Sequence, residues 1–520
     1  MSKSLMIQGT GSGTGKSLIV TALCRIFRDM GINVAPFKAQ NMALNSYITD
    51  DGGEIGRAQA LQAEAARIEP AVDMNPILLK ASGDMGSQVI VHGKVHATMK
   101  AREYYAFKKN AWQAVKESFK RLSGKYELIV MEGAGSPAEI NLMDVDIVNM
   151  AAAKYAKAPV ILVGDIDKGG VFASLYGTVK LLGKDSRHIK AFIINKFRGD
   201  FGILKPGLEM IKAKTGKQVI GVLPYIKDIG LPEEDGLSLG QGARGRGQGA
   251  KEIKIVVVRL QYISNFTDFD PFLCEQDVEL VYSSNPADIE NADIVIIPGS
   301  KNTMKDFMLL KETFLDKSIK QAYSKGVQII GMCGGYQMLG RKIYDPQNVE
   351  SSHKKINGIG LLNIETSFEK NKTTCQTEAE ILGLRDWGLG FSKEKTNPQS
   401  PTPNPKLRGY EIHMGESSGD IGLFRINRLS GLNSLNSLSR SDCLLDGSRN
   451  GNCWGTYLHG IFENDHFRRG IINNIRKQRG LPPVACTVRY AEIKDRAIDN
   501  LANVVRENID LNYIKKVIGI

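Results

Sequence analysis

The chain has 520 residues, more than the roughly 250–300 at which a single core stops growing, so we expect several domains. Its net charge of +12 is spread without long basic runs, and no motif supports nucleic-acid binding. The charge would suit an anionic small substrate, but we favour the simpler interpretation that it serves surface solubility. Seven cysteines without CxxC spacing disfavour a disulfide framework or a zinc site. No apolar run reaches the roughly 18 residues that span a membrane, and the N-terminus begins with a predicted strand, so we expect a cytoplasmic protein without a membrane partner.

A phosphate-binding loop is the first motif of the chain. An apolar strand at residues 4–8 and an apolar helix at residues 18–30 flank a glycine-rich segment with the candidate ATP-binding residues Thr10, Gly13, Gly15, Lys16 and Ser17. Glycines allow successive N–H groups to point at one anion, while the lysine reaches the terminal phosphates and the Ser17 hydroxyl binds Mg²⁺. The usual first glycine is shifted by one position to Gly9, a form that resembles the loop of dethiobiotin synthetase and its relatives.

Three further strands bring candidate residues to the same edge of the first sheet. One ends at Lys38, before an amide-rich segment predicted as a loop, and one at residues 128–132 ends in Glu132. Since ligands bind beyond the carboxyl ends of parallel strands, we expect Lys38 near ATP and Glu132 at the metal. Asn195 follows another such strand, where nucleotide-binding relatives contact the base. Asp144 and Asp146 either face this site or cap the next helix.

The repeated pattern of apolar strands and helices divides the chain into two parallel-sheet α/β domains. We expect a P-loop NTPase-like domain at residues 1–236, a glycine-rich linker at 237–251 and a second α/β domain at 252–467. The linker is too short and too poor in aromatic residues for a nucleic-acid contact. A basic helical extension, residues 468–520, is expected to pack on the second domain.

The second domain is organised around Cys333. An apolar strand at residues 327–330 leads into a glycine-flanked turn with the cysteine at its apex, and a helix is expected from Tyr336. This pattern is typical of a nucleophile elbow, in which the thiol lies at a helix N-terminus that favours thiolate. The alternative is a buried structural cysteine. Backbone N–H groups of Gly299 and Gly334 are candidates for an oxyanion hole.

Two late histidines are candidate partners for this thiol. His459 follows a predicted strand and precedes a glycine, so it is our preferred general base. His413 is the rival, for which we favour a structural role. The Pro-, Asn- and Ser-rich segment 393–406 between them is predicted to be an insertion away from the chemistry.

Taken together, the two sets of motifs resemble the glutamine-dependent amidases of corrin biosynthesis. The resemblance covers essentially the whole chain and includes the phosphate loop and the segments 37–46, 132–137, 164–170, 331–337 and 457–460. It implies a class I glutamine amidotransferase domain, flavodoxin-like in fold, in which Cys333 forms a thioester with glutamine and His459 moves protons. It also implies that Gly299, Gly334 and Gln337 form the oxyanion and glutamine-binding site.

The first domain would then use ATP and Mg²⁺ to activate a corrin carboxylate for capture of ammonia. The closest resemblance is to the amidase that acts on the b, d, e and g side chains of adenosylcobyrinic acid a,c-diamide. Many class I members carry a glutamate two residues after the histidine, but this chain has Ile461 there, which leaves Glu463 as a candidate substitute. The alternatives are the sister a,c-diamide synthase and a partitioning-type ATPase switch, which would not explain a thiol elbow with a histidine partner.

Overall fold

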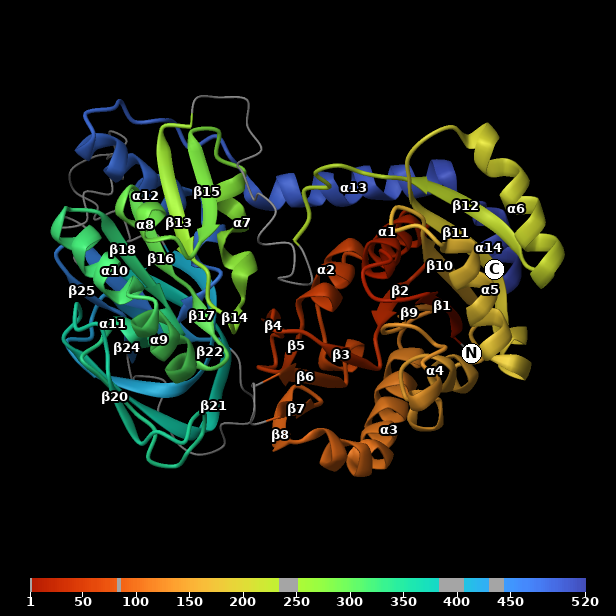
Figure 1. Ribbon diagram of the computed structural model, residues 1–520, viewed down its shortest axis with the longest axis horizontal. Coiled ribbons are helices and arrows are strands. Elements are labelled where there is room, and N and C mark those ends of the chain that lie inside the picture. Colours follow the sequence, from red (N-terminus) through yellow and green to blue (C-terminus); the bar gives the residue numbers. More distant parts are fainter. Residues whose placement is uncertain (1, 82–85, 233–250, 383–405, 430–443) are drawn as a thin grey trace.

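A computed structural model describes residues 2–81, 86–232, 251–382, 406–429 and 444–520 of the chain. It shows two α/β units, one from the N-terminal half and one from the second half of the chain (Figure 1). The expected linker 237–251 and insertion 393–406 lie almost wholly outside the described residues. No helix in the described part of the chain is long and apolar enough to span a membrane.

The first unit is built on a six-stranded parallel sheet in the order β12-β11-β10-β1-β9-β2. Its strands are β1 (Lys3–Gly9), β2 (Val34–Phe37), β9 (Leu128–Glu132), β10 (Val160–Asp165), β11 (Ile189–Phe197) and β12 (Gln218–Pro224). Its helices are α1 (Lys16–Asp29), α2 (Arg57–Ala65), α3 (Ala101–Ser123), α4 (Met150–Tyr155), α5 (Val171–Leu181) and α6 (Phe201–Thr215). Because β1 lies between β9 and β10, the loop that follows it adjoins the ends of both neighbours.

We predicted the amide-rich segment after β2 to be a loop. It instead contains two short strands, β3 (Gln40–Met42) and β4 (Ser46–Ile48). β3 joins a small sheet with β6 (Ile77–Ala81), β7 (Ser87–Val91) and β8 (Lys94–Met99), and β4 pairs with β5 (Glu54–Gly56). Three-residue strands carry too little periodicity to be read from sequence. These strands form the side of the first unit that faces the second (Figure 1).

The second unit contains a parallel sheet in the order β15-β13-β16-β18-β26, with β25 added antiparallel. The strands are β13 (Ile253–Val258), β15 (Val278–Ser283), β16 (Ile294–Ile297), β18 (Gln328–Met332), β25 (Ser448–Asn450) and β26 (Cys453–Thr456). The helices are α7 (Asp270–Leu273), α8 (Pro286–Glu290), α9 (Thr303–Glu312), α10 (Leu315–Ser324) and α11 (Gly334–Leu339). This strand order is that of the flavodoxin-like fold, as predicted.

A mainly antiparallel sheet, in which β19 and β21 pair parallel, adjoins this parallel sheet. It consists of β19 (Lys342–Tyr344), β20 (Lys355–Asn357), β21 (Ile364–Ile381), β22 (Lys406–Gly419), β23 (Phe424–Arg428), β24 (Leu444–Asp446) and β27 (Leu458–His459). A two-stranded ladder of β14 (Ile263–Ser264) and β17 (Gly299–Ser300) completes the unit. The long strands β21 and β22 contact β4 of the first unit, where Ile48 packs with Tyr410 and Ile412.

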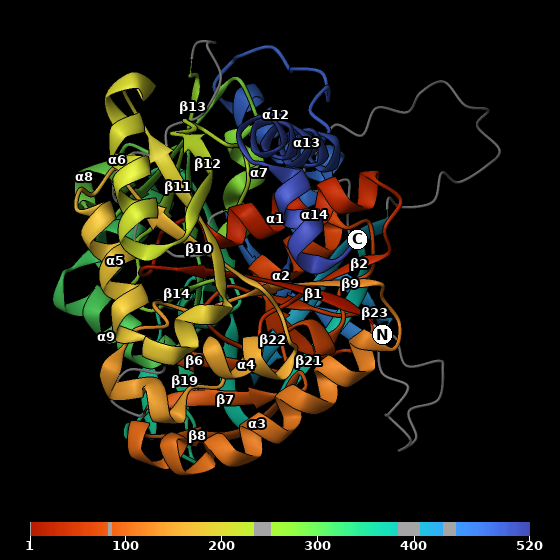
Figure 2. The same ribbon diagram turned by 90° about the vertical axis from the view of Figure 1, so that its right-hand side faces the viewer.

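The C-terminal extension packs differently from our prediction. Only α12 (Asp465–Gln478) joins the core of the second unit, whereas α13 (Tyr490–Asn508) and α14 (Leu511–Ile518) pack on the first unit beside α1 (Figure 2). The fully buried Arg25 of α1 forms ion pairs with Asp495 and Asp499 of α13. The apolar stripe of α13 is readable from the sequence, but periodicity does not say which domain the stripe covers.

Candidate functional site

Cys333 lies at the apex of a tight turn between β18 and α11, as predicted, although the helix begins at Gly334 rather than Tyr336. Its φ of 49° is rare for a residue with a side chain and indicates a strained elbow. Gly335 is required here because a Cβ at that position would lie 1.9 Å from the carbonyl oxygen of Ile297. Cys333 as a whole is 8% exposed, and its backbone N–H donates to the Thr456 carbonyl at 2.9 Å.

His459 approaches this thiol from β27. Its Nδ1 lies 2.6 Å from Oδ2 of Asp268, and its buried Nε2 has no hydrogen-bond partner within the described part of the chain. Burial alone would lower the pKa of the imidazole, but the Asp268 carboxylate and the Cys333 sulfur raise that pKa to about 10. At neutral pH the histidine is therefore a cation beside the sulfur, and it carries a proton that it can donate.

Asp268 is the orienting residue that the sequence left unassigned. It lies in a short 3₁₀ helix (Phe266–Phe269), is 4% exposed, and also accepts the Gly460 N–H at 3.2 Å. Our candidate substitute, Glu463, is wrong for this role because its carboxylate binds Arg57 at 2.7 Å. The sequence signal that could have identified Asp268 is a carboxylate within an aromatic segment that is otherwise buried. A buried carboxylate needs a charged or hydrogen-bonded partner.

His413 has the structural role that we favoured. Its Nδ1 lies 2.8 Å from the Gly415 carbonyl, its Nε2 lies 3.3 Å from a Glu411 carboxylate oxygen, and its ring stacks on Tyr457 at 3.9 Å. Both ring nitrogens are therefore engaged, although the residue lines the same pocket as Cys333.

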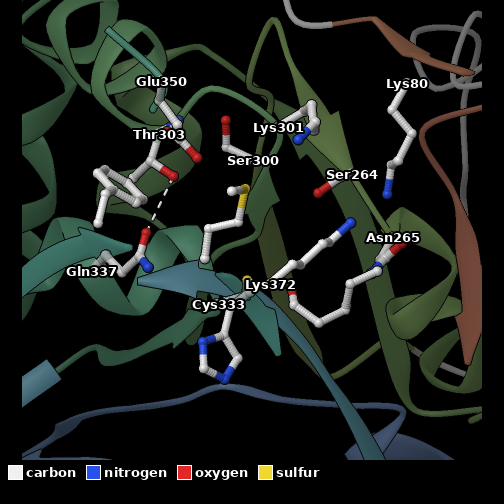
Figure 3. Close-up of a pocket in the computed structure, with 14 residues that line it drawn as sticks. Lys80, Ser264, Asn265, Ser300, Lys301, Thr303, Cys333, Gln337, Glu350 and Lys372 are labelled. Carbon is white, nitrogen blue, oxygen red and sulfur yellow. Dashed lines mark hydrogen bonds between the residues drawn. The ribbon is translucent and has the colours of Figure 1, made fainter. Parts of the chain in front are cut away.

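The three predicted oxyanion and glutamine-binding residues surround the elbow. Gly299 lies on β17, where a Cβ would meet the His459 ring at 3.4 Å, and Gly334 begins α11 directly after the cysteine. Gln337 is 2% exposed; its amide accepts from the Thr303 hydroxyl at 3.2 Å and donates to Tyr457 at 3.2 Å. Figure 3 shows Gln337, Thr303 and Cys333 around one pocket.

In the first unit, the loop between β1 and α1 has the form of a phosphate cradle. Gly13 and Gly15 have positive φ values of 70° and 91°, and the Lys16 ammonium donates to the carbonyl of Gly11 at 2.8 Å across the loop. The backbone N–H of Thr10 donates to the Val163 carbonyl at 2.9 Å, so this N–H anchors the loop to β10 and is not directed at a phosphate.

Glu132 forms the opposite wall of this cradle. One of its carboxylate oxygens accepts from Ser17 Oγ at 2.9 Å and from Lys38 Nζ at 2.8 Å, and the other accepts from Gln62 at 2.6 Å. The predicted residues Ser17, Lys38 and Glu132 therefore meet at one point. No cluster of three or more His, Cys, Asp or Glu side chains suited to a metal occurs in the described ranges. A hydroxyl with a single carboxylate fits Mg²⁺, which retains waters and takes phosphate oxygens as further ligands.

Asn195 borders the loop from the end of β11. Its side-chain amide donates to the Thr14 carbonyl at 2.9 Å, and a Cβ on Gly15 would lie 2.1 Å from it. The ammonium of the neighbouring Lys196 donates to the Gly13 carbonyl at 2.7 Å and to Asp165 at 2.8 Å. Asp146 caps the turn into α4 by accepting three backbone N–H groups, from Val148, Asn149 and Ala151.

A pair of asparagines connects the two units next to the histidine. The Ser46 N–H donates to Asn265 at 3.0 Å, and the Phe266 N–H donates to Asn45 at 3.1 Å. Asn265 Nδ2 lies 3.4 Å from His459 Nδ1. The turn that carries Asp268 is thus held by a loop of the first unit.

Comparison with known proteins supports both halves of this description. Residues 5–239 match the CobQ/CobB/MinD/ParA nucleotide-binding domain, and residues 254–467 match the CobB/CobQ-like glutamine amidotransferase domain. Cobyric acid synthase of Thermodesulfovibrio yellowstonii is 49% identical over the full length of both chains. Those of a Thermoanaerobacter species and of Caldanaerobacter subterraneus are 48% and 47% identical, each over 99% of both chains. The chain belongs to the cobyric acid synthase family.

Membership of the cobyric acid synthase family confirms the resemblance expected from the motifs. It also confirms the predicted fold class, a nucleotide-binding α/β domain followed by a glutamine amidotransferase domain. Both expected centres therefore lie in domains of the matching kind: Cys333 in the amidotransferase domain and the phosphate loop in the nucleotide-binding domain.

Proposed function

We propose that this protein is an ATP- and glutamine-dependent cobyric acid synthase. It amidates the b, d, e and g carboxylates of adenosylcobyrinic acid a,c-diamide. The main support for the proposal is that Cys333, His459 and Asp268 lie together in the amidotransferase domain. The chain that contains them is 49% identical to a cobyric acid synthase over its whole length. The working domains are residues 1–236 and 252–467, joined by 237–251.

The glutamine half-reaction takes place at Cys333. The thiolate attacks the side-chain carbonyl of glutamine, and N–H groups of Gly299 and Gly334 stabilise the oxyanion. His459 gives its proton to the departing nitrogen, so that the C–N bond breaks, ammonia leaves and a thioester remains. Water, deprotonated by the histidine, then hydrolyses the thioester to glutamate. Gln337 supports the substrate pocket from α11.

The amide-forming half-reaction takes place in the first domain. ATP transfers its terminal phosphoryl group to a corrin carboxylate, ADP leaves, and ammonia displaces phosphate from the acyl phosphate to give the amide. Gly13, Gly15 and Lys16 hold the phosphates, and Lys38 and Asn195 border the nucleotide. Ser17 and Glu132 would hold Mg²⁺, which neutralises phosphate charge when bound.

A cytoplasmic location suits this activity. The six cysteines in the described ranges are all free thiols, which fits a reducing compartment.

Mass spectrometry of the corrin tests the substrate assignment directly. With glutamine and ATP, the purified protein should convert adenosylcobyrinic acid a,c-diamide in four steps, each lowering the mass by about one unit as carboxylate becomes amide. If only cobyrinic acid is amidated, at two positions, the protein is the sister a,c-diamide synthase. ATP hydrolysis without amidation of either corrin would instead favour a partitioning-type ATPase switch.

A further inference from the structure

The pocket above Cys333 is formed by both domains. Lys80 enters it from β6 of the first domain, and Lys301 and Lys372 enter it from the second. Figure 3 shows Lys80 and Lys372 pointing toward one another across the pocket. Three lysine side chains in one small pocket are unusual, because buried ammonium groups lose hydration and repel one another.

Two residues of the first domain hold these lysines together. Glu54 accepts from Lys80 at 2.9 Å through one carboxylate oxygen and from Lys372 through the other. Gln88 accepts from Lys301 at 3.2 Å and from Lys372 at 3.4 Å through a single amide oxygen. The three ammonium groups are therefore linked through shared acceptors and lie within reach of one small anion.

The electrostatics of this cluster favour an additional negative charge. Burial lowers the pKa of Lys372 to about 7; Glu54 opposes the decrease, whereas Lys80 and Lys301 add to it. Burial also lowers the pKa of Lys301, as does Lys80. A bound anion would restore the charged form of these lysines, and this gain strengthens its binding.

The opposite wall of the pocket carries Glu350. Its carboxylate accepts the Thr303 N–H at 2.8 Å. Burial raises the pKa of the Glu350 carboxyl to about 7, which Lys301 opposes. An α-ammonium group beside Glu350 would favour its charged form, so Lys80 and Lys372 on one side and this carboxyl on the other match a zwitterionic α-amino acid better than a phosphate or a dicarboxylate. The pocket also contains the nucleophile, so the amino acid that it receives is the amide donor.

We infer that Lys80, Lys301 and Lys372 form the subsite for the α-carboxylate group of glutamine, with Glu350 facing its α-ammonium group. This inference rests on the proposed glutaminase function. It means that the first domain contributes a side chain, Lys80, to the glutamine site of the second. Glutamine therefore binds tightly only when the two domains are docked.

Comparing glutamine with 4-aminobutanamide tests the subsite, because this analogue keeps the amide and the amine but lacks the carboxylate. Lys372→Met and Lys80→Met should each lower kcat/KM for glutamine by about 10- to 100-fold, mainly through KM, while the rate on 4-aminobutanamide stays unchanged. The preference for glutamine then shrinks by the same factor. Lys372→Arg should keep most of the preference, because it keeps the charge.

Lys406→Met is the matched control, since this lysine of the same sheet is 65% exposed. It should leave the preference for glutamine unchanged. If Lys372→Met or Lys80→Met lowers kcat/KM for both substrates equally, or leaves the preference for glutamine intact, the proposed subsite is wrong. The proposed glutaminase activity would be unaffected by that result. The two variants alter different domains, so misfolding of one leaves the other as the test. If the wild type hydrolyses no glutamine, the proposed function fails together with the subsite.

Discussion

The Nδ1 atom of His459 lies 2.6 Å from Oδ2 of Asp268, although the two residues are 191 positions apart in the sequence. This pair holds the ring through Nδ1 and leaves Nε2 free of the carboxylate, and together with Cys333 it raises the pKa of the histidine to about 10. Asp268 thus fulfils the orienting role that a glutamate two residues after the histidine has in many class I amidotransferases. It does so from the opposite end of the domain sequence.

Replacing Asp268 with asparagine should cost about 100-fold or more in kcat for glutamine hydrolysis, because the imidazolium loses the carboxylate that stabilises it. The pKa of His459 should fall from about 10, so the alkaline limb of the pH–rate profile should move to lower pH. Steady-state glutaminase assays across pH 6–11 measure both effects. Glu463→Gln is the matched control and should leave the limb in place.

The same pair predicts how stability depends on pH. Because the folded-state pKa of His459 is raised from 6.5 to about 10, its contribution is fully present below pH 6.5 and disappears as the pH rises through 10. The difference in the free energy of unfolding between wild type and Asp268→Asn should therefore be largest at and below pH 6.5 and shrink as the pH rises towards 10. Urea titrations at several pH values measure it, and a difference independent of pH would argue against the pair.

Glu132→Gln should separate the two half-reactions. The Glu132 carboxylate accepts hydrogen bonds from Ser17, Lys38 and Gln62, and we assign it to the Mg²⁺ site. The substitution should therefore reduce amidation by about 100-fold or more, whether glutamine or ammonia supplies the nitrogen. Glutamine hydrolysis measured alone should persist. Glu139→Gln, an exposed glutamate shortly after the same strand, should have no effect. Full amidation by Glu132→Gln would remove this residue from the ATP site.

Leu501→Ala tests the packing of the C-terminal extension. Leu501 of α13 is 4% exposed within the core of the first domain, and its truncation should cost about 2–5 kcal/mol of stability. The loss should appear in the unfolding transition that ATP protects, because ATP binds the first domain. The exposed Glu507→Ala on the same helix is the control. A loss confined to the glutaminase domain would support our original placement instead.

Long apolar strands and glycine-rich turns were predictable because their signals are local. The phosphate loop, the Cys333 elbow and the acid at the end of β9 all belong to single strand–loop segments. Asp268 was missed because its function depends on a partner far away in the sequence, and the short strands β3 and β4 were missed because three residues carry no period. The packing of α13 on the first unit was not predictable, because it involves ion pairs with Arg25. In the sequence, Arg25 is only one basic residue of an amphipathic helix.

Cys333 should couple glutamine hydrolysis to amide formation, and a comparison of nitrogen sources measures this coupling. Wild type and Cys333→Ala are given ATP and adenosylcobyrinic acid a,c-diamide, with either glutamine or ammonia, and the corrin is followed by mass spectrometry. We predict that Cys333→Ala loses glutamine-dependent amidation by about 10⁴-fold or more and keeps ammonia-dependent amidation at the wild-type rate. If Cys333→Ala still hydrolyses glutamine and amidates the corrin as fast as wild type, the thiol is not the nucleophile and does not supply ammonia to the first domain.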